Sequence, residues 1–86
     1  MIKGLNHFVF HTPVQAGEIV EVLDGGTRIF VGARGAHVEL TLSRGLASLS
    51  RPKVGDYVVE YPHGYIDILS PEDFAAKVVA GGAGVR

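Results

Sequence analysis

Arginines beside glycine-rich turns are the residues of this chain whose types and spacing best suit binding chemistry. Asp24-Gly-Gly-Thr-Arg28 and Gly32-Ala-Arg-Gly-Ala36 each place a guanidinium next to backbone that glycine leaves exposed. Exposed amides and an arginine together suit an anion such as a phosphate, whereas the alternative is a hairpin turn with a solvated arginine. Arg44, Arg51 and Lys53 follow in the next irregular segment and can extend a basic rim. The ligand-binding residues expected on the first interpretation are Arg28, Gly32, Arg34, Gly35 and Arg44.

Established catalytic and cofactor motifs are missing from the sequence. There is no cysteine, no serine in a nucleophile elbow, and neither a GxxxxGK[ST] nor a helix-initiating GxGxxG phosphate loop. His7 and His11 are four residues apart in a strand-like segment, which separates them by about 13 Å, too far for one metal ion. Asp56, Glu60 and Asp67 can face one another across the last hairpin, but ordinary surface acids show the same pattern. We therefore expect no enzyme activity, no metal and no cofactor.

The composition indicates one soluble domain that gains from self-association. Of the 86 residues, 47% are hydrophobic and 20% are charged, a large apolar fraction for a chain whose small core is marginal when alone. We expect a homo-oligomer; the alternative is one tight core rich in valine and alanine. A net charge of −1 favours neither nucleic acid nor a membrane. The N-terminus lacks the apolar core of a signal peptide, and no apolar run approaches the ~20 residues of a membrane span, so we expect an intracellular protein.

Residue periodicity and turn chemistry predict six strands and one helix. Thr12-Pro13 marks the end of the first strand, and Asp24-Gly25 lies between two β-rich runs, where a hairpin turn needs the positive φ that glycine tolerates. Residues 37–42 alternate polar and apolar, which is typical of a strand with one buried face. Ser70-Pro71 followed by two acids is typical of a helix start. The predicted strands cover residues 5–10, 17–23, 27–31, 37–42, 57–61 and 65–69, and the predicted helix covers roughly residues 71–80.

These elements predict an α+β fold that is mostly β: a small antiparallel curled sheet or open barrel of about six strands with one short C-terminal helix. A helix of this length does not persist alone, so its Phe74 and Val78 side must pack on the sheet. The three tyrosines of the last hairpin are expected as sheet and core residues rather than as a base-stacking platform. Residues 43–50 are ambiguous, a loop with one helical turn. We expect a single domain over residues 1–86, with a β-rich part at 1–50, a hairpin-plus-helix module at 51–80 and a frayed tail at 81–86.

Residues 54–74 carry the family resemblance of the chain. The residues that match its pattern, approximately Gly-Asp-Tyr-x-Val-x-Tyr-x-x-Gly-Tyr-x-x-x-Ser-Pro-x-x-x-Phe, are Gly55, Asp56, Tyr57, Val59, Tyr61, Gly64, Tyr65, Ser70, Pro71 and Phe74. This segment resembles a module that recurs at the C-terminus of many small, mostly uncharacterised bacteriophage proteins. The chain has Leu69 where that module usually has an aromatic residue, and its helix is set one residue differently. The match covers about a quarter of the chain and bears on origin and fold more than on activity.

The resemblance implies a phage accessory protein that acts in the host cytoplasm. Such proteins are often binders that block a host enzyme or sequester a nucleotide signal of a host defence system. We expect first a non-enzymatic oligomer that binds a small anionic, nucleotide-like ligand through Arg28, Arg34, Arg44 and the glycine turns, and so counters host defence. Two alternatives stay open. One is a protein–protein inhibitor of a host enzyme or defence factor that uses the closing hairpin and helix, and the other is a virion or assembly component.

Overall fold

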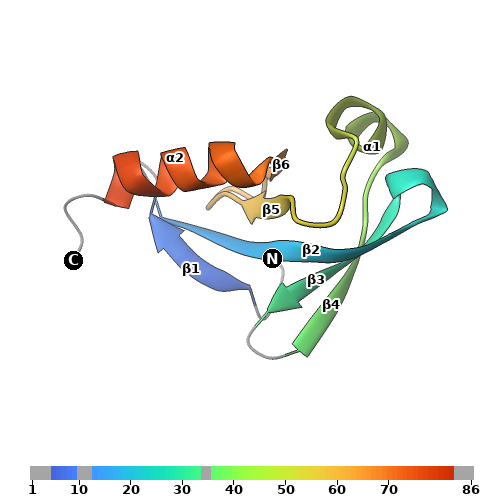
Figure 1. Cartoon of the computed structure of the whole chain (residues 1–86), viewed down its shortest axis with the longest axis horizontal. Coiled ribbons are helices and arrows are strands. Elements are labelled where there is room, and N and C mark those ends of the chain that lie inside the picture. The colour runs from blue at the N-terminus through green and yellow to red at the C-terminus, as the bar shows by residue number, and fades with distance from the viewer. Residues whose placement is uncertain (1–4, 10–12, 34–35, 83–86) are drawn as a thin grey trace.

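A curled antiparallel sheet with two short helices forms the part of the chain that the computed structural model describes, which is residues 5–9, 13–33 and 36–82 (Figure 1). The elements in chain order are β1 (Asn6–Val9), β2 (Pro13–Leu23), the 3-10 turn η1 (Asp24–Gly26), β3 (Arg28–Ala33), β4 (Ala36–Thr41), α1 (Arg44–Ser50), β5 (Tyr57–Glu60), β6 (Ile66–Leu69) and α2 (Pro71–Gly82). The strand order is β4-β3-β2-β5-β6, and β1 also pairs with β2. The sheet does not close into a barrel. The predicted mostly-β fold with a C-terminal helix is confirmed.

The long strand β2 joins the two halves of the sheet. Its first half pairs with β1 and with β5, so Ala16 lies opposite both Asn6 and Val59. Its second half pairs with β3. The register shifts between Ile19 and Glu21, and a bulge of this kind bends a strand and increases its twist. The bend lets β2 pair with β1 and β5 along its first half and with the differently oriented β3 along its second half. This change of direction gives the sheet its curl.

The second strand starts earlier than predicted, whereas the turn that follows it lies where it was predicted. Pro13, predicted to lie in the break after the first strand, instead opens β2, which starts four residues before the predicted Gly17. Proline is tolerated at the first residue of a strand, where its missing N–H is not needed for the ladder. The hairpin turn after β2 is confirmed, and Asp24, Gly25 and Gly26 have φ values of 52°, 70° and 100°. Three successive positive φ values explain why this turn uses glycines.

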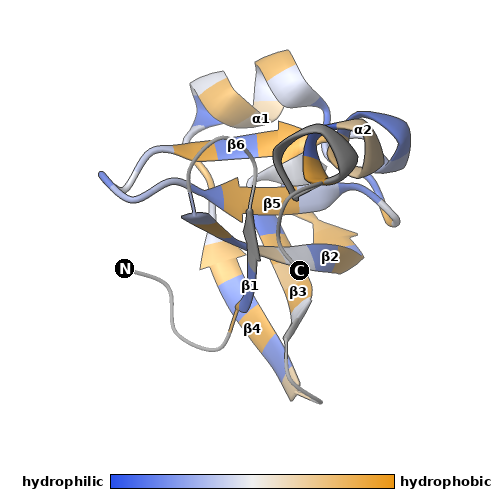
Figure 2. Ribbon diagram, turned by 90° about the vertical axis from the view of Figure 1, so that its left-hand side faces the viewer, coloured by the Kyte–Doolittle hydropathy of each residue, from blue (hydrophilic) through white to orange (hydrophobic). Residues whose placement is uncertain are grey.

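Apolar side chains gather on both faces of the sheet. Alternation along β5 places Val58 in one cluster and Val59 in the other. The first cluster comprises the buried residues Leu5, Ile19, Ile29, Val31, Leu42 and Val58. The second comprises Val14, Ala16, Val59, Leu69 and Phe74, the last of which comes from α2. Figure 1 shows α2 running along one face of the sheet and α1 close to the turn between β2 and β3, and Figure 2 shows hydrophobic and polar residues alternating along the strands.

Serine caps set where both helices start. Ser43 Oγ accepts a hydrogen bond from the Leu46 N–H at 3.1 Å, and Ser70 Oγ accepts one from the Asp73 N–H at 3.1 Å. α1, expected as a loop with one helical turn, is a seven-residue helix that ends at Arg51 in the left-handed conformation. α2 starts at the predicted residue and runs to position 82, two residues beyond the predicted end. Neither helix of the described chain combines the length and hydropathy that crossing a bilayer requires.

Candidate functional site

Arg28 lies between two carboxylates rather than facing an open anion site. Its Nε donates to Glu39 Oε2 at 2.5 Å, and its Nη1 lies 3.8 Å from Asp24 Oδ2. The hydrogen bond and the charge of Glu39 raise the pKa of Arg28 above its ordinary value. The guanidinium carbon also lies 5.9 Å from the centre of the Phe30 ring. The two acids therefore offset the positive charge that a phosphate would need.

Of the residues predicted at the second glycine-rich stretch, the one that the structure describes lies in a strand and not in a turn. Gly32 lies within β3, opposite His37 of β4, so it does not supply the turn amides that the sequence suggested. The ladder continues past it to the pair of Ala33 and Ala36, which lengthens the strand beyond the predicted end. Arg34 and Gly35 lie outside the described residues.

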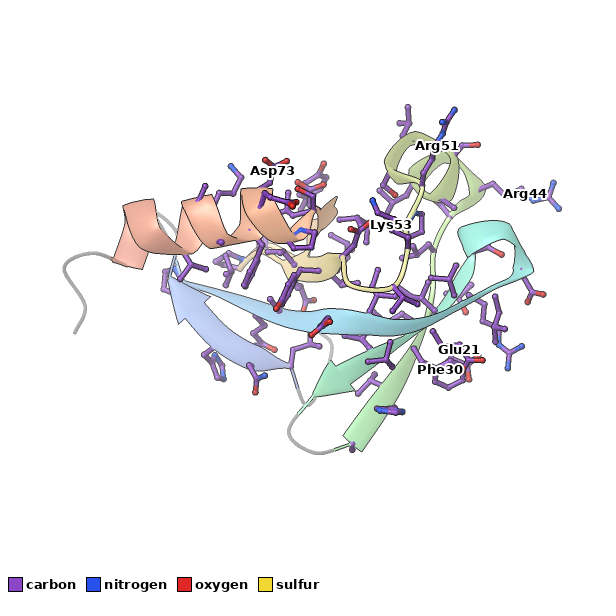
Figure 3. The ribbon with its side chains drawn as sticks, in the orientation of Figure 1. Glu21, Phe30, Arg44, Arg51, Lys53 and Asp73 are labelled. Carbon is purple, nitrogen blue, oxygen red and sulfur yellow. The ribbon has the colours of Figure 1, made fainter. Side chains whose placement is uncertain are left out.

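A shallow depression of about 390 Å³, the arginine hollow, brings Arg44 beside the predicted glycine turn. It is lined by Asp24, Gly25, Thr27, Arg44, Ala47 and Ser48. Asp24 and Arg44 line the same hollow, and the Thr27 hydroxyl already donates to the backbone oxygen of Asp24 at 2.8 Å. Figure 3 shows Arg44, Arg51 and Lys53 extending in different directions around α1. The predicted basic rim is therefore not formed by these three side chains.

A second depression, the hairpin hollow, lies at the end of β5, where the chain enters the hairpin to β6. It measures about 220 Å³ and is lined by His7, Pro13, Val14, Gln15, Glu60, Tyr61 and Pro62. Its walls are mostly apolar, Glu60 is only 5% exposed, and Gln15 lies directly opposite Glu60 on β2. A concave apolar wall with a few polar groups is typical of small-molecule sites, which hold drug-sized ligands in roughly 300–1,000 Å³. The smaller hairpin hollow suits a single ring system.

Three rings of the β5–β6 hairpin meet beside this hollow. The ring centres of Tyr61 and Tyr65 are 5.8 Å apart, and each lies 6.3 Å from that of His63. The expectation that the tyrosines are sheet and core residues is confirmed for Tyr57, whose ring stacks on Phe74 at 4.0 Å. It is wrong for Tyr65, which is 59% exposed. Tyr61 belongs to both the ring trio and the hollow, so aromatic surface and hydrogen-bonding groups adjoin there.

The hairpin hollow cannot be predicted from the sequence, because its lining residues are far apart in the chain. His7 comes from β1, Gln15 from β2 and Glu60 from β5, and only the β1–β2 and β2–β5 pairings bring them together. The sequence offers one weak local indication of this site, since Gln15 and Glu60 each interrupt an otherwise apolar stretch of a buried strand. Nothing in the sequence says that these two residues are opposite one another.

The three acids of the last hairpin do not face one another. Asp67 lies opposite Val59 and Glu60 lies opposite Ile66, and adjacent strand positions point to opposite faces of a sheet. Asp56 precedes β5 and accepts a hydrogen bond from the Lys53 N–H at 3.2 Å. Across the described ranges, no three His, Asp or Glu side chains gather closely enough to hold a metal ion.

Comparisons with known proteins add no family assignment. No protein-family model, no curated protein and no solved structure matches this chain.

Tyr61 is expected to ionise above 10.0, the ordinary tyrosine pKa. Burial raises the pKa of Tyr61, and the negative charge of Asp67 raises it further. Because the folded state favours the neutral phenol, the stability linked to this group is complete below the ordinary pKa and is lost as pH rises through the raised one. Subtracting the ultraviolet titration of Tyr61→Phe from that of the wild type isolates the Tyr61 transition. Asp67→Asn should lower its midpoint, and a midpoint at or below 10.0 in the wild type would contradict this environment.

Proposed function

We propose that this protein is a non-enzymatic binding protein and that the hairpin hollow takes the planar ring of a small nucleotide-like ligand. The observation that carries the proposal is the composition of the hollow, which has mostly apolar walls and includes the polar residues Gln15 and Glu60 in its lining. A ring that leaves water for such walls gains hydrophobic burial. The Gln15 amide can both donate and accept hydrogen bonds, and the Glu60 carboxylate accepts them. These donors and acceptors complement the hydrogen-bonding groups on the edge of an amino-substituted heterocycle such as a nucleobase.

Tyr61 supplies the stacking surface in this proposal. Aromatic side chains stack on any nucleobase because every base has a π face, and each such contact contributes about 1–3 kcal/mol. Tyr61 lines the hollow and its ring neighbours those of His63 and Tyr65, so aromatic surface continues from the hollow to the exposed hairpin. The ring of the ligand is therefore placed against Tyr61, with its polar edge toward Gln15 and Glu60.

The charged part of the ligand remains outside the hollow. Arg28, expected to bind it, is engaged by Glu39 and Asp24, and Arg44 lines the arginine hollow together with Asp24. A phosphate at either arginine would face a nearby acid. We therefore propose that recognition rests on the ring and its polar edge, and that the phosphate adds little affinity.

The resemblance of residues 54–74 to a phage module suggests what such binding achieves. A small phage protein that binds a nucleotide signal withdraws it from the host defence system that reads it. Sequestration of this kind requires affinity and abundance and no bond-making step. We propose that the protein acts in this way in the host cytoplasm.

Calorimetric titration with matched nucleosides and nucleotides tests this function. Both ligands of a pair are expected to bind, with similar affinity. Tyr61→Ala should weaken binding about tenfold or more, because a stacking contact of about 1–3 kcal/mol is removed. Tyr61→Phe keeps the ring and should retain most of the affinity. Circular dichroism of each variant separates loss of binding from loss of folding.

Arg44→Ala is the matched control, because it alters the arginine hollow and leaves the hairpin hollow untouched. Its affinity should equal that of the wild type. Binding restricted to phosphorylated ligands and abolished by Arg44→Ala would move the site to the arginine hollow and overturn the proposed location. The absence of binding across a broad panel of nucleosides and nucleotides would overturn the ligand class.

A protein–protein inhibitor is the second candidate, because the closing module displays both an aromatic and an acidic surface. Tyr65 is 59% exposed, and Glu72 and Asp73 are exposed in the first turn of α2, where Figure 3 shows Asp73 on the side away from the sheet. This role predicts a host protein that co-purifies with tagged protein and is lost when both acids are changed to lysine. Detection of the chain in purified particles by mass spectrometry would instead favour a virion component.

A further inference from the structure

The outer edge of β4 lacks the bulge, the proline and the lysine that often protect an edge strand. Among the described strands β4 pairs with β3 alone and stands at the end of the strand order. Its pairing runs from Ala36 to Thr41 without a bulge, and the strand contains neither proline nor lysine. Alternate N–H and C=O groups of an edge strand point outward and can pair with another chain unless such devices prevent it. Within residues 5–9, 13–33 and 36–82, the β4 edge is therefore open to a further strand.

The opposite edge of the sheet is protected by contrast. β6 has only four residues, and within it Asp67 Oδ1 accepts a hydrogen bond from the Ile68 N–H at 2.8 Å. A side chain that bonds to the backbone of its own strand competes with pairing to another strand. Short length and a side chain of this kind are both ways of blunting an edge. β1, which pairs with β2 alone among the described strands, is also only four residues long. Of the described outer strands β1, β4 and β6, β4 is therefore the one with the length for strand addition.

The apolar layer beneath β4 is also incomplete at this edge. Ile29 and Val31 of β3 are fully buried, whereas Leu40 and Val38, directly opposite them on β4, are only half-buried. Another strand beside β4 would cover the exposed parts of Val38 and Leu40 and continue the hydrophobic layer. The occupant must therefore present apolar residues on the same face and at the same two-residue spacing.

We propose that a second copy of this chain occupies this edge, with the two β4 strands antiparallel about a two-fold axis at Val38. In a continuous sheet, residues that lie directly opposite one another point to the same face. Neighbouring residues of one strand point to opposite faces, so the two-fold axis must pass through a residue and not between two residues. An axis at Glu39 would set two carboxylates directly opposite, which is destabilising. An axis at Val38 sets His37 of each copy opposite Glu39 of the other. It also places Val38 against its own copy and Ala36 against Leu40.

The electrostatics of the outer face agree with this register. His37 and Glu39 are both exposed and lie on the face opposite the core, so the pairing requires no burial of a charge in the apolar layer. Glu39 Oε2 already accepts the hydrogen bond of Arg28 within each copy. A carboxylate has acceptor sites for a second partner, so the cross-strand contact with His37 adds to that pair and does not replace it.

Analytical ultracentrifugation over a concentration series tests the proposed dimer. The wild type should approach twice the 9.1 kDa mass of the chain. His37→Glu sets two pairs of acids opposite one another and should raise the dimer dissociation constant about tenfold or more. Thr41→Glu is the matched control, since it adds the same charge to the same face of β4 with no acid opposite it in this register. Its dissociation constant should stay near that of the wild type.

A mixing experiment tests the register independently. Glu39→Lys alone should dimerise poorly, because it sets His37 opposite lysine, but mixing it with His37→Glu should restore dimers that contain one copy of each. A wild type that stays at 9.1 kDa at every concentration would overturn the proposal. A His37→Glu variant that dimerises as tightly as the wild type, or a Thr41→Glu variant that is equally disrupted, would overturn the register. Circular dichroism confirms that each variant is folded.

Discussion

Replacing Phe74 by alanine is expected to lower the free energy of unfolding by about 3–5 kcal/mol. Phe74 is 6% exposed, and its ring lies parallel to that of Tyr57 with the centres 4.0 Å apart. It packs in the cluster that includes Val14 and Val59, to which α2 contributes it as a buried side chain. A helix of this length is marginal without tertiary packing. Loss of the ring therefore leaves a cavity and weakens the docking of the whole helix.

Urea unfolding followed by circular dichroism measures this effect. Phe74→Leu is the conservative control, because it keeps most of the apolar volume and should cost only about 1–1.5 kcal/mol. Small domains are typically stable by about 5–15 kcal/mol, so the alanine variant should lose a large part of its total stability. A loss below about 1 kcal/mol for Phe74→Ala would contradict the packing of α2 on the sheet.

Replacing Gly17 by alanine is expected to destabilise the protein by about 3 kcal/mol, the upper part of the range for overpacked sites. A methyl group at Gly17 would lie 2.5 Å from Val31 Cγ1 and 2.6 Å from the backbone oxygen of Gly32. The side chain of Val31 can turn only by disturbing a fully buried neighbourhood, and the oxygen belongs to the paired strand β3. The added methyl group must therefore push β2 and β3 apart.

Gly45 provides the matched control for Gly17. It lies in α1, and an alanine methyl group there would have no atom within 4 Å. Alanine favours a helix over glycine and restricts the unfolded chain, so Gly45→Ala should raise the free energy of unfolding by about 0.5 kcal/mol. The same urea experiment reports both variants. Equal effects of the two substitutions would show that backbone propensity, and not the close approach at Gly17, decides the result.

The parts of the fold that follow from the sequence are those with local signals. The N-terminus of α2 is one example, because Ser70 stands before a proline and two acids, a pattern typical of a helix start. The Ser70 hydroxyl accepts a hydrogen bond from a backbone N–H of the first turn, so the signal comes from neighbouring residues alone. The turn after β2 is likewise set by Asp24 and the glycines that follow it, all with positive φ. Val38 and Leu40 alternate with polar residues, so the face that β4 turns to the core is also readable in advance.

The parts that do not follow are those that depend on pairing between distant strands. Pro13 reads locally as a break, but the neighbours β1 and β5 make it the first residue of the central strand. Gly17 reads as a strand residue of no special role, and its packing against Val31 exists only once β2 and β3 pair. The candidate site shows the same division. Glycine turns near arginines are visible in the sequence, whereas the acids that neutralise Arg28 include Glu39 from another strand.

A nitrogen–proton NMR titration of the wild type with a nucleoside tests most directly whether the hairpin hollow binds the ring of a ligand. The predicted result is that the largest amide shift changes cluster at Gln15 and Tyr61, which line this hollow, while Gly25 and Ser48 in the arginine hollow stay unchanged. Shift changes confined to Gly25 and Ser48, or no changes at saturating nucleoside, would contradict the proposed function.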